Sequence, residues 1–308
     1  MNKGASKPLI FLAVCASALS GVGAYAWHEW KRPPILEIYV FDLPGSPAVL
    51  IRTPDDKRIL VDGGSNSDVV RGLTGVLPFY SRRIDAVIVT VADGKHTTGL
   101  IDVLNRYDVG KIIIPAITLE SLGLASSTDE IYKTFLETID QKGIPPEYAL
   151  AGRRFTLDQA GVDSLASSTV MSILFPVPAD DFKYSKASGP ETLFRIDHGS
   201  SSVVFTGGAT SKIQKYIAAN LMPADVLVVS NNPTASNLSL GLVNAIAPDY
   251  IVYSKTITTK PPAAFSAKTK PKPDPLAGIL ADHRFNIKET GGVKIKSDGS
   301  DVKVENIR

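Results

Sequence analysis

Apolar and polar residues follow two alternating patterns along this chain, one typical of strands and one typical of helices. Residues 35–41 are β-branched, aromatic or leucine apart from Glu37, which predicts a strand. Residues 48–53 and 58–64 predict a hairpin, because the Asp-rich turn 54–57 lies between them. The apolar run 84–91 predicts a buried strand. Further strands are expected at 111–115, 153–157, 170–175, 191–197, 200–206, 224–230, 250–254, 285–290, 292–296 and 301–306.

Helical periodicity alternates with these strands. Ile131, Phe135 and Ile139 would share one face of a helix over 127–142. Thr97 or Thr98 is expected to cap the helix that follows the strand 84–91. Other helices are expected at 68–77, 118–122, 210–221, 238–246 and 276–283. Hairpins followed by strand–helix units in both halves predict the α/β class, with two mixed sheets face to face in a four-layer αββα sandwich.

The N-terminus carries a charge-free run from Pro8 to Trp27, preceded by Lys3 and Lys7. Such a run is just long enough to cross a bilayer as a helix. Lysines on its N-terminal side favour an orientation that places the rest of the chain outside the cytoplasm. We therefore expect a single-pass protein of the cell membrane, with residues 1–34 as anchor and linker and residues 35–308 as the folded domain.

Two other interpretations of this segment remain open. Residues 24–26 read Ala-Tyr-Ala, which is similar to a signal-peptidase site, and cleavage there would release a secreted protein. The residues before Cys15 are loosely similar to a lipoprotein signal. All three interpretations export the folded domain.

The composition limits which partners and which metal ligands the folded domain can have. A net charge of +2 over 308 residues argues against a general nucleic-acid-binding surface. Cys15 is the only cysteine, so a metal site in the folded domain would need His, Asp or Glu. There are four histidines. Of these, His96 lies in the polar loop after the strand 84–91, where a site at a sheet edge would be found.

The residues in and near this loop have two readings each. His96 and Asp93 are residual candidates for metal ligands, yet both could equally make hydrogen bonds near a helix start. Asp62 is a third candidate, although it would also suit a tight turn before Gly63 and Gly64, which are expected at positive φ. No residue stands out as catalytic. His198 is expected to be a turn residue.

Three segments, residues 52–64, 77–79 and 83–90, resemble those of a known family in their sequence and order. This order of segments resembles the metallo-β-lactamase superfamily, and within it the extracytoplasmic domain of the ComEC competence family. The similarity continues through 107–109, 193–196, 204–207, 224–229 and 248–254. The resemblance covers about residues 35–300. It implies an αββα sandwich with its site at one edge, and a link to DNA uptake.

The metal-binding motif of that family is degenerate here. The family loop after Thr90 reads H-x-H-x-D-H and holds zinc. In this chain Val91 stands at the first His, Asp93 at the second and Lys95 at the Asp, and only His96 is retained. Val91 cannot coordinate a metal, and Lys95 would place a positive charge beside it.

Two further family motifs are also changed. Residues 206–208 read Thr-Gly-Gly where the family has a metal-bridging Asp, and residues 231–233 read Asn-Asn-Pro where it has His-His-Gly. Asn231 and Asn232 could still contact a ligand, although turn chemistry also explains them. The resemblance thus implies a pseudoenzyme that has lost its metal.

A second candidate site is the loop 255–275, which is rich in lysine and proline. Its lysines could contact the phosphates of DNA by charge alone. A solvated loop without a ligand explains the same composition. The lysines considered as nucleic-acid contacts are Lys260, Lys268, Lys270 and Lys272.

Two functions follow from these observations. One is a membrane-anchored, catalytically degenerate domain that acts as a binding or scaffold module, with DNA or an envelope protein as partner and no cofactor. The other is an active metal-dependent hydrolase or nuclease, in which Asp93, His96 and Asp62 hold zinc or manganese. The sequence does not identify a substrate or an oligomeric state.

Overall fold

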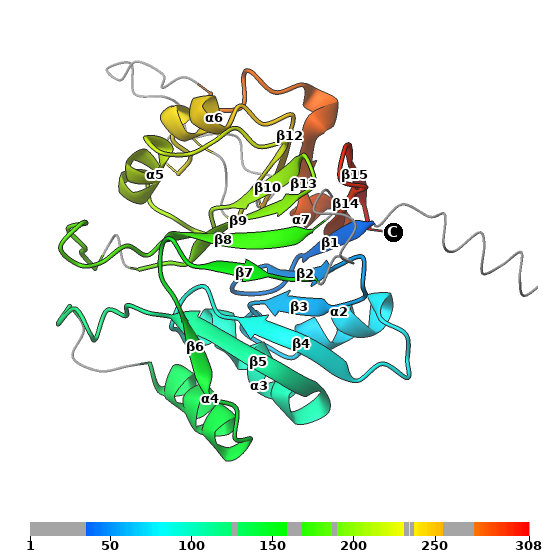
Figure 1. Ribbon diagram of the computed structural model, residues 1–308, viewed down its shortest axis with the longest axis vertical. Coiled ribbons are helices and arrows are strands. Elements are labelled where there is room, and N and C mark those ends of the chain that lie inside the picture. The colour runs from blue at the N-terminus through cyan, green and yellow to red at the C-terminus, as the bar shows by residue number, and fades with distance from the viewer. Residues whose placement is uncertain are drawn as a thin grey trace, which may run out of the picture. The chain divides into compact units, whose positions relative to one another are not determined.

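Two β-sheets face each other and share an apolar core, and helices cover their outer faces (Figure 1). The computed structural model describes residues 35–124, 129–158, 168–186, 190–230, 234, 237–254 and 274–307. All of them lie within one compact unit, Ile35–Arg308. The expected mixed α/β sandwich of two sheets and outer helices is confirmed.

The first sheet has eight strands within the described residues, in the order β15-β14-β1-β2-β3-β4-β5-β6. β3, β4, β5 and β6 run parallel, and the remaining pairs are antiparallel. The strands are β1 (Leu36–Phe41), β2 (Ala48–Arg52), β3 (Arg58–Val61), β4 (Arg83–Ile88), β5 (Asp108–Pro115), β6 (Pro146–Ala149), β14 (Gly292–Ser297) and β15 (Val302–Asn306).

The second sheet has seven strands within the described residues, in the order β13-β12-β11-β10-β9-β8-β7. β10 to β13 run parallel, while β7 to β10 form antiparallel pairs. The strands are β7 (Arg154–Thr156), β8 (Thr169–Phe175), β9 (Leu193–His198), β10 (Ser201–Phe205), β11 (Val226–Val229), β12 (Tyr250–Tyr253) and β13 (Arg284–Asn286).

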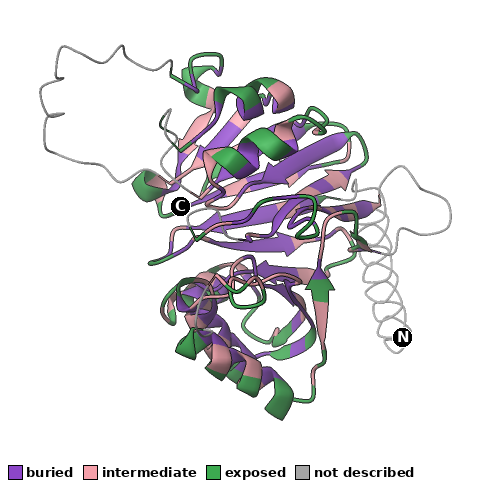
Figure 2. Ribbon diagram, turned by 90° about the vertical axis from the view of Figure 1, so that its left-hand side faces the viewer, coloured by how far each residue is buried: buried purple, intermediate pink, exposed green. Residues whose placement is uncertain are grey.

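Five of the helices in the described residues lie over an outer face and bury one apolar side there, whereas Ile287 of α7 joins the core between the sheets. The helices are α2 (Asp68–Val76), α3 (Gly94–Arg106), α4 (Glu130–Gln141), α5 (Ser211–Ala218), α6 (Leu240–Ile246), α7 (Ile287–Thr290) and the 3-10 helix η2 (Ala281–His283). α2, α3 and α4 pack on the first sheet and α5 and α6 on the second. Between the sheets, apolar side chains from both inner faces form the central core, which is buried throughout (Figure 2).

The parallel strands of both sheets end at one edge of the sandwich. β3 ends before Asp62 and β4 before Thr90, and in the second sheet β11 ends before Ser230. Residues from all three places line one cavity. In open α/β sheets ligands bind where the carboxyl ends of parallel strands meet. This edge, called the site edge below, therefore carries the candidate site.

The start of α3 differs from the sequence prediction. Neither Thr97 nor Thr98 caps the helix, because Asp93 precedes it and accepts a hydrogen bond from the backbone N–H of His96. The two threonine hydroxyls lie inside the first turn and donate to the carbonyls of Asp93 and Gly94, at 2.8 and 2.6 Å. An aspartate is as good a cap as a threonine, so pattern alone did not decide between them.

Several short elements also differ from the prediction. Residues 118–122 form turns rather than a helix, and of the helix expected at 276–283 only η2 is present. Residues 287–290 form the short helix α7, because the Asn286 side chain accepts the N–H of Lys288 and caps it. Strand β6 was not expected. In such short segments the apolar pattern does not separate strand from helix.

No helix among the residues that the structure describes is long and apolar enough to cross a bilayer. The predicted anchor or signal at 8–27 lies outside the described residues.

Close packing of β3 against α3 generates a prediction. A Cβ atom on Gly99 would lie 2.0 Å from the carbonyl oxygen of Gly63. We expect Gly99→Ala to lower the free energy of unfolding by about 3 kcal/mol or more, since backbone has to move. Gly75→Ala is the matched control, because no atom lies within 4 Å of its Cβ. It should stabilise α2 by about 0.5 kcal/mol. Urea unfolding of the full chain in detergent measures both, and equal effects would contradict the prediction.

Candidate functional site

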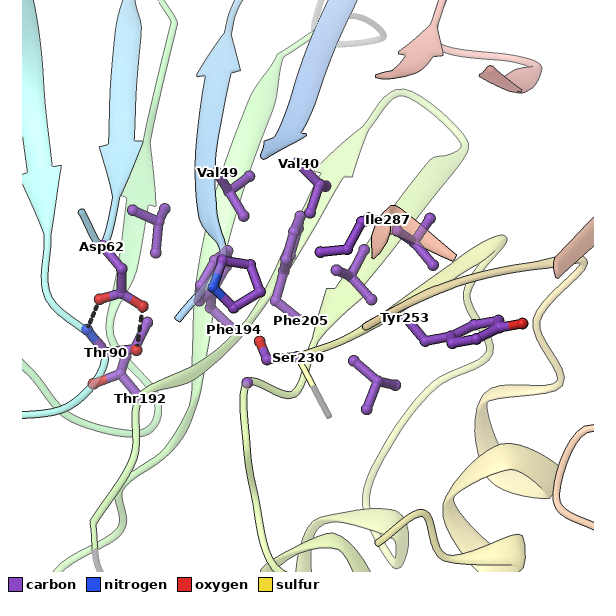
Figure 3. A pocket seen from close by; sticks show the side chains of 16 residues that line it. Val40, Val49, Asp62, Thr90, Thr192, Phe194, Phe205, Ser230, Tyr253 and Ile287 are labelled. Atoms are coloured by element: carbon purple, nitrogen blue, oxygen red, sulfur yellow. Dashed lines mark hydrogen bonds between the residues drawn. The ribbon is translucent and has the colours of Figure 1, made fainter. Parts of the chain in front are cut away.

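A narrow cavity opens at the site edge, between the ends of the two sheets (Figure 3). Its volume is about 20 Å³, which is room for about one water molecule. Apolar side chains such as Phe194 and Phe205 make up most of the wall. Polar groups line it as well, and Asp62, Thr90 and Ser230 supply three of them from the ends of the parallel strands. The strands thus deliver polar groups to one end of an otherwise apolar core.

Asp62 is held by Thr90 through both of its carboxyl oxygens. Oδ1 accepts the backbone N–H of Thr90 at 2.8 Å, and Oδ2 accepts the Thr90 hydroxyl at 2.5 Å (Figure 3). Asp62 is buried and adopts φ +57°. This pair, called the Asp62–Thr90 clasp below, joins the end of β3 to the end of β4. The expected turn role of Asp62 is therefore supported by two hydrogen bonds to the neighbouring strand end.

The two glycines after Asp62 serve different purposes. Gly64 has φ +69°, as expected from the sequence. Gly63 does not have a positive φ, so that part of the prediction is wrong. Its missing side chain is required for another reason, because a Cβ atom there would lie 2.6 Å from the backbone nitrogen of Leu100. The glycine pair thus lets the β3 turn pack against the start of α3.

Asp93 and His96 form a second bonded pair. The Oδ1 atom of Asp93 lies 2.6 Å from Nδ1 of His96 and also caps α3 through the His96 backbone N–H. The backbone carbonyl of His96 accepts the N–H of Gly63 at 2.8 Å, which fixes the loop against β3. The imidazole is oriented by Asp93 through Nδ1, so Nε2 is the ring nitrogen left to meet a ligand.

Glu191 is a member of this site that the sequence did not indicate. It lies just before β9. The next residue is Thr192, whose N–H donates to the carbonyl of Thr90 at 2.8 Å. Its Oε2 atom is buried and has no hydrogen-bond partner among the described residues. A Cβ atom on Gly207 would lie 3.7 Å from that oxygen. No sequence motif surrounds Glu191. It could have been predicted only by pairing the segment before β9 with the segment after β4.

The four groups influence one another's charge. Burial raises the pKa of Glu191 to about 7, although the positive charge of His96 opposes this. Burial likewise raises the pKa of Asp62. For His96, burial lowers the pKa, but the carboxylates of Asp62 and Asp93 outweigh it and the net shift is upward. Asp93 is the exception, since its bonded His96 overcomes burial and lowers its pKa. The four groups are therefore coupled, and Glu191 is the member whose pKa lies near neutral pH.

The residues at this edge do not fit a zinc centre as they are arranged. Among the described residues, no three His, Cys, Asp or Glu side chains converge as metal ligands do. Both oxygens of Asp62 already accept hydrogen bonds from Thr90, and Nδ1 of His96 is bonded to Asp93. The structure thus brings Asp62, Asp93 and His96 to one edge and within electrostatic reach, but not into a coordination shell.

The other candidates lie elsewhere. Residues 231–233 and 255–273, with all the asparagines and lysines proposed as ligand contacts, lie outside the described residues. His198 is not a turn residue, because it is buried in β9 with Nδ1 3.1 Å from the Thr169 hydroxyl. His283 ends η2, and its Nδ1 atom lies 3.0 Å from the carbonyl oxygen of Asp249.

Comparison with known proteins gives structural neighbours only. No protein-family model matches the sequence, and no curated protein is significantly similar to it. The metallo-beta-lactamase fold protein YhfI from Bacillus subtilis is 14% identical, with a TM-score of 0.45, over 72% of this chain and 86% of its own. Human tRNase Z, short form, is 12% identical, with a TM-score of 0.41, over 70% of this chain and 91% of its own.

A third neighbour is longer than the chain described here. CmlA, a diiron beta-hydroxylase from Streptomyces venezuelae, is 16% identical, with a TM-score of 0.46, over 72% of this chain. The match spans 45% of CmlA, so this chain corresponds to less than half of that protein. Identities and TM-scores at this level do not assign a family or an activity to the chain.

The pKa of Glu191 generates a pH prediction. Its carboxyl ordinarily titrates at 4.5 and here at about 7, so the folded state holds a proton that the unfolded chain releases. The free energy of unfolding should therefore fall as the pH rises through this range, by about 1–3 kcal/mol. Glu191→Gln removes this titration and should flatten the profile.

The measurement is urea unfolding of the full chain in detergent at several pH values. Glu120→Gln, which makes the same change on an exposed turn, should keep the wild-type profile. A Glu191→Gln profile that falls as steeply as that of the wild type would show that the carboxyl is not protonated by burial.

Proposed function

We propose that this chain is an extracytoplasmic, membrane-anchored protein with a metallo-β-lactamase-like fold that acts as a binding or scaffold module and does not hydrolyse a substrate with zinc. The observation that carries the proposal is the bonding of the candidate ligands. The Asp62–Thr90 clasp and the Asp93–His96 pair use these side chains to hold two loops in place. Groups used in this way support the backbone around a ligand-binding edge.

The chemistry of the edge indicates what it could bind. Oε2 of Glu191 accepts no hydrogen bond from the described residues, and Asp62 and Asp93 lie within its electrostatic reach. Excess acceptors in a partly apolar cleft favour a ligand that donates hydrogen bonds or carries positive charge. A phosphate backbone would be repelled from this cluster, so a DNA contact would have to lie elsewhere on the domain.

A metal-dependent hydrolase is the second candidate function. The Oε2 atom of Glu191 is the observation that favours it. The resemblance places a bridging Asp at residue 208, where this chain has glycine. The free Oε2 atom of Glu191 lies beside the neighbouring Gly207 and could replace that carboxylate. This would require Asp62 to leave Thr90 and His96 to bind zinc or manganese through Nε2.

Metal analysis distinguishes the two functions. We expect full chain purified without chelator to contain far less than one equivalent of zinc or manganese, and to cleave neither a phosphodiester nor DNA. His96→Ala should leave the metal content unchanged and cost about 1–2 kcal/mol of stability, because it removes one hydrogen bond to a charged group. A matched His198→Ala variant tests for nonspecific metal binding. Roughly one metal ion per chain that is lost only in His96→Ala would contradict the proposal.

More specifically, we propose that the domain takes part in DNA uptake, as its resemblance to ComEC suggests. The sequence resemblance alone supports this part of the proposal. The lysines that would make the DNA contact belong to residues 255–275, which come after β12 in the sequence. We expect DNA binding in a gel-shift titration to weaken steeply as salt is raised.

Deletion of residues 260–273 should abolish that binding, since it removes Lys260, Lys268, Lys270 and Lys272. A variant with the same length of glycine and serine is the control for chain connectivity. Binding that survives the deletion would exclude the loop as the DNA contact, and full chain that binds no DNA would leave an envelope protein as the expected partner.

A further inference from the structure

Two adjacent aromatic side chains are exposed in the loop between α2 and β4. The exposed fractions are 90% for Phe79 and 75% for Tyr80. The two rings pack edge to face, with centroids 5.4 Å apart. Their exposed fractions show that the body of the domain covers neither ring. Figure 1 shows this loop projecting beyond the strand ends. Large apolar side chains exposed together indicate a surface that contacts a partner.

Positive charge accompanies these rings. Arg82 lies two residues after Tyr80 in the same loop, and Arg106 ends α3 nearby; both are exposed. Both lie near Tyr107, where burial raises the pKa of the hydroxyl and the two guanidinium groups oppose that shift. Neither arginine forms an ion pair with a described residue, whereas Arg83 is paired with Asp85. The loop and the adjacent end of α3 therefore present two aromatic rings and two guanidinium groups without an ion pair among the described residues.

The loop lies at the edge of the sandwich opposite the site edge. β4 starts at Arg83, directly after the loop, and runs toward the site edge. β1 runs in the same direction as β4, because β1–β2 and β2–β3 are antiparallel and β3–β4 is parallel. The described chain therefore enters the first sheet at the loop edge. The two strand starts are three strand spacings apart, roughly 14 Å. Ile35, also apolar, is 41% exposed there.

The length of the preceding segment limits how far this edge can lie from a bilayer. Seven residues lie between Trp27 and Ile35, so eight Cα-to-Cα steps join them. At the greatest extension of a chain these steps span about 28 Å. If 8–27 crosses the membrane, as the proposed function requires, a tether of at most this length allows the edge with Phe79 and Tyr80 to reach the lipid surface.

We propose that the α2–β4 loop rests on an anionic phospholipid bilayer, with Phe79 and Tyr80 at the interface and Arg82 and Arg106 against lipid phosphates. This inference rests on the membrane anchor of the proposed function. Aromatic side chains favour the bilayer interface, and each arginine near an anionic surface adds attraction. Since the site edge is opposite, this contact would turn the candidate site away from the membrane.

Single-stranded nucleic acid is the competing partner for aromatic rings beside arginines. Binding of that kind uses ring faces on which successive bases stack. Phe79 and Tyr80 pack edge to face on each other and offer no such row of parallel faces. The short tether at Ile35 also favours the bilayer.

A fluorescent label in the loop tests the inference. The full chain carries Cys15→Ser and Tyr80→Cys, and the new thiol bears an environment-sensitive dye. The control is the same dye at Leu240→Cys, since Leu240 is exposed at the start of α6, next to the site edge. Both proteins are reconstituted into vesicles of phosphatidylcholine, with or without phosphatidylglycerol.

We expect a blue-shifted emission that a lipid-soluble quencher removes, for position 80 and not for position 240. The shift should be larger with phosphatidylglycerol and should be lost with added Phe79→Ser or with Arg82→Gln and Arg106→Gln together. Identical spectra at the two positions would overturn the inference. A shift that appears only on addition of single-stranded DNA would overturn it in favour of nucleic acid.

Extraction with alkaline carbonate separates this inference from the membrane anchor. A protein that resists extraction but shows no shift at position 80 keeps the anchor and loses the loop contact. A protein that is extracted, yet shows the shift when vesicles are added, loses the anchor and keeps the loop contact.

Discussion

The Asp62–Thr90 clasp is the interaction on which the candidate site depends. Asp62 adopts φ +57°, a conformation that most side chains avoid, and its carboxylate accepts two hydrogen bonds from the end of the neighbouring strand. This arrangement fixes where β3 turns, where the loop after β4 begins, and how α3 packs on Gly63. Glu191 enters the same site because Thr192 bonds to the carbonyl of Thr90.

The clasp also explains how the edge can be polar without being a metal centre. Asp62 and Asp93 are used to organise backbone, and His96 is oriented by Asp93. One carboxyl oxygen, Oε2 of Glu191, remains without a hydrogen-bond donor among the described residues. A buried acceptor of this kind is costly unless it is protonated or meets a ligand. The raised pKa of Glu191 favours protonation of this carboxyl. A bound ligand that donates a hydrogen bond would satisfy the acceptor instead.

Much of the fold could be predicted from the sequence, because long apolar strands and amphipathic helices have distinct periods. The two sheets and the helices α2, α3 and α4 follow this rule. Short elements such as β6 and α7 could not be predicted, since four residues do not define a period. In the site, Asp62, Asp93 and His96 could be named from their place after strands. Glu191 could not, because only the pairing of two distant segments brings it there.

The central claim is that His96 is held by carboxylates and is not a metal ligand. The nitrogen chemical shifts of its ring, followed by NMR as pH is changed with and without added zinc, test this most directly. We expect a proton on Nδ1 shared with Asp93, a pKa above the ordinary histidine value, and the same titration with equimolar zinc. A zinc-dependent shift at Nε2, with loss of the titration, would contradict it.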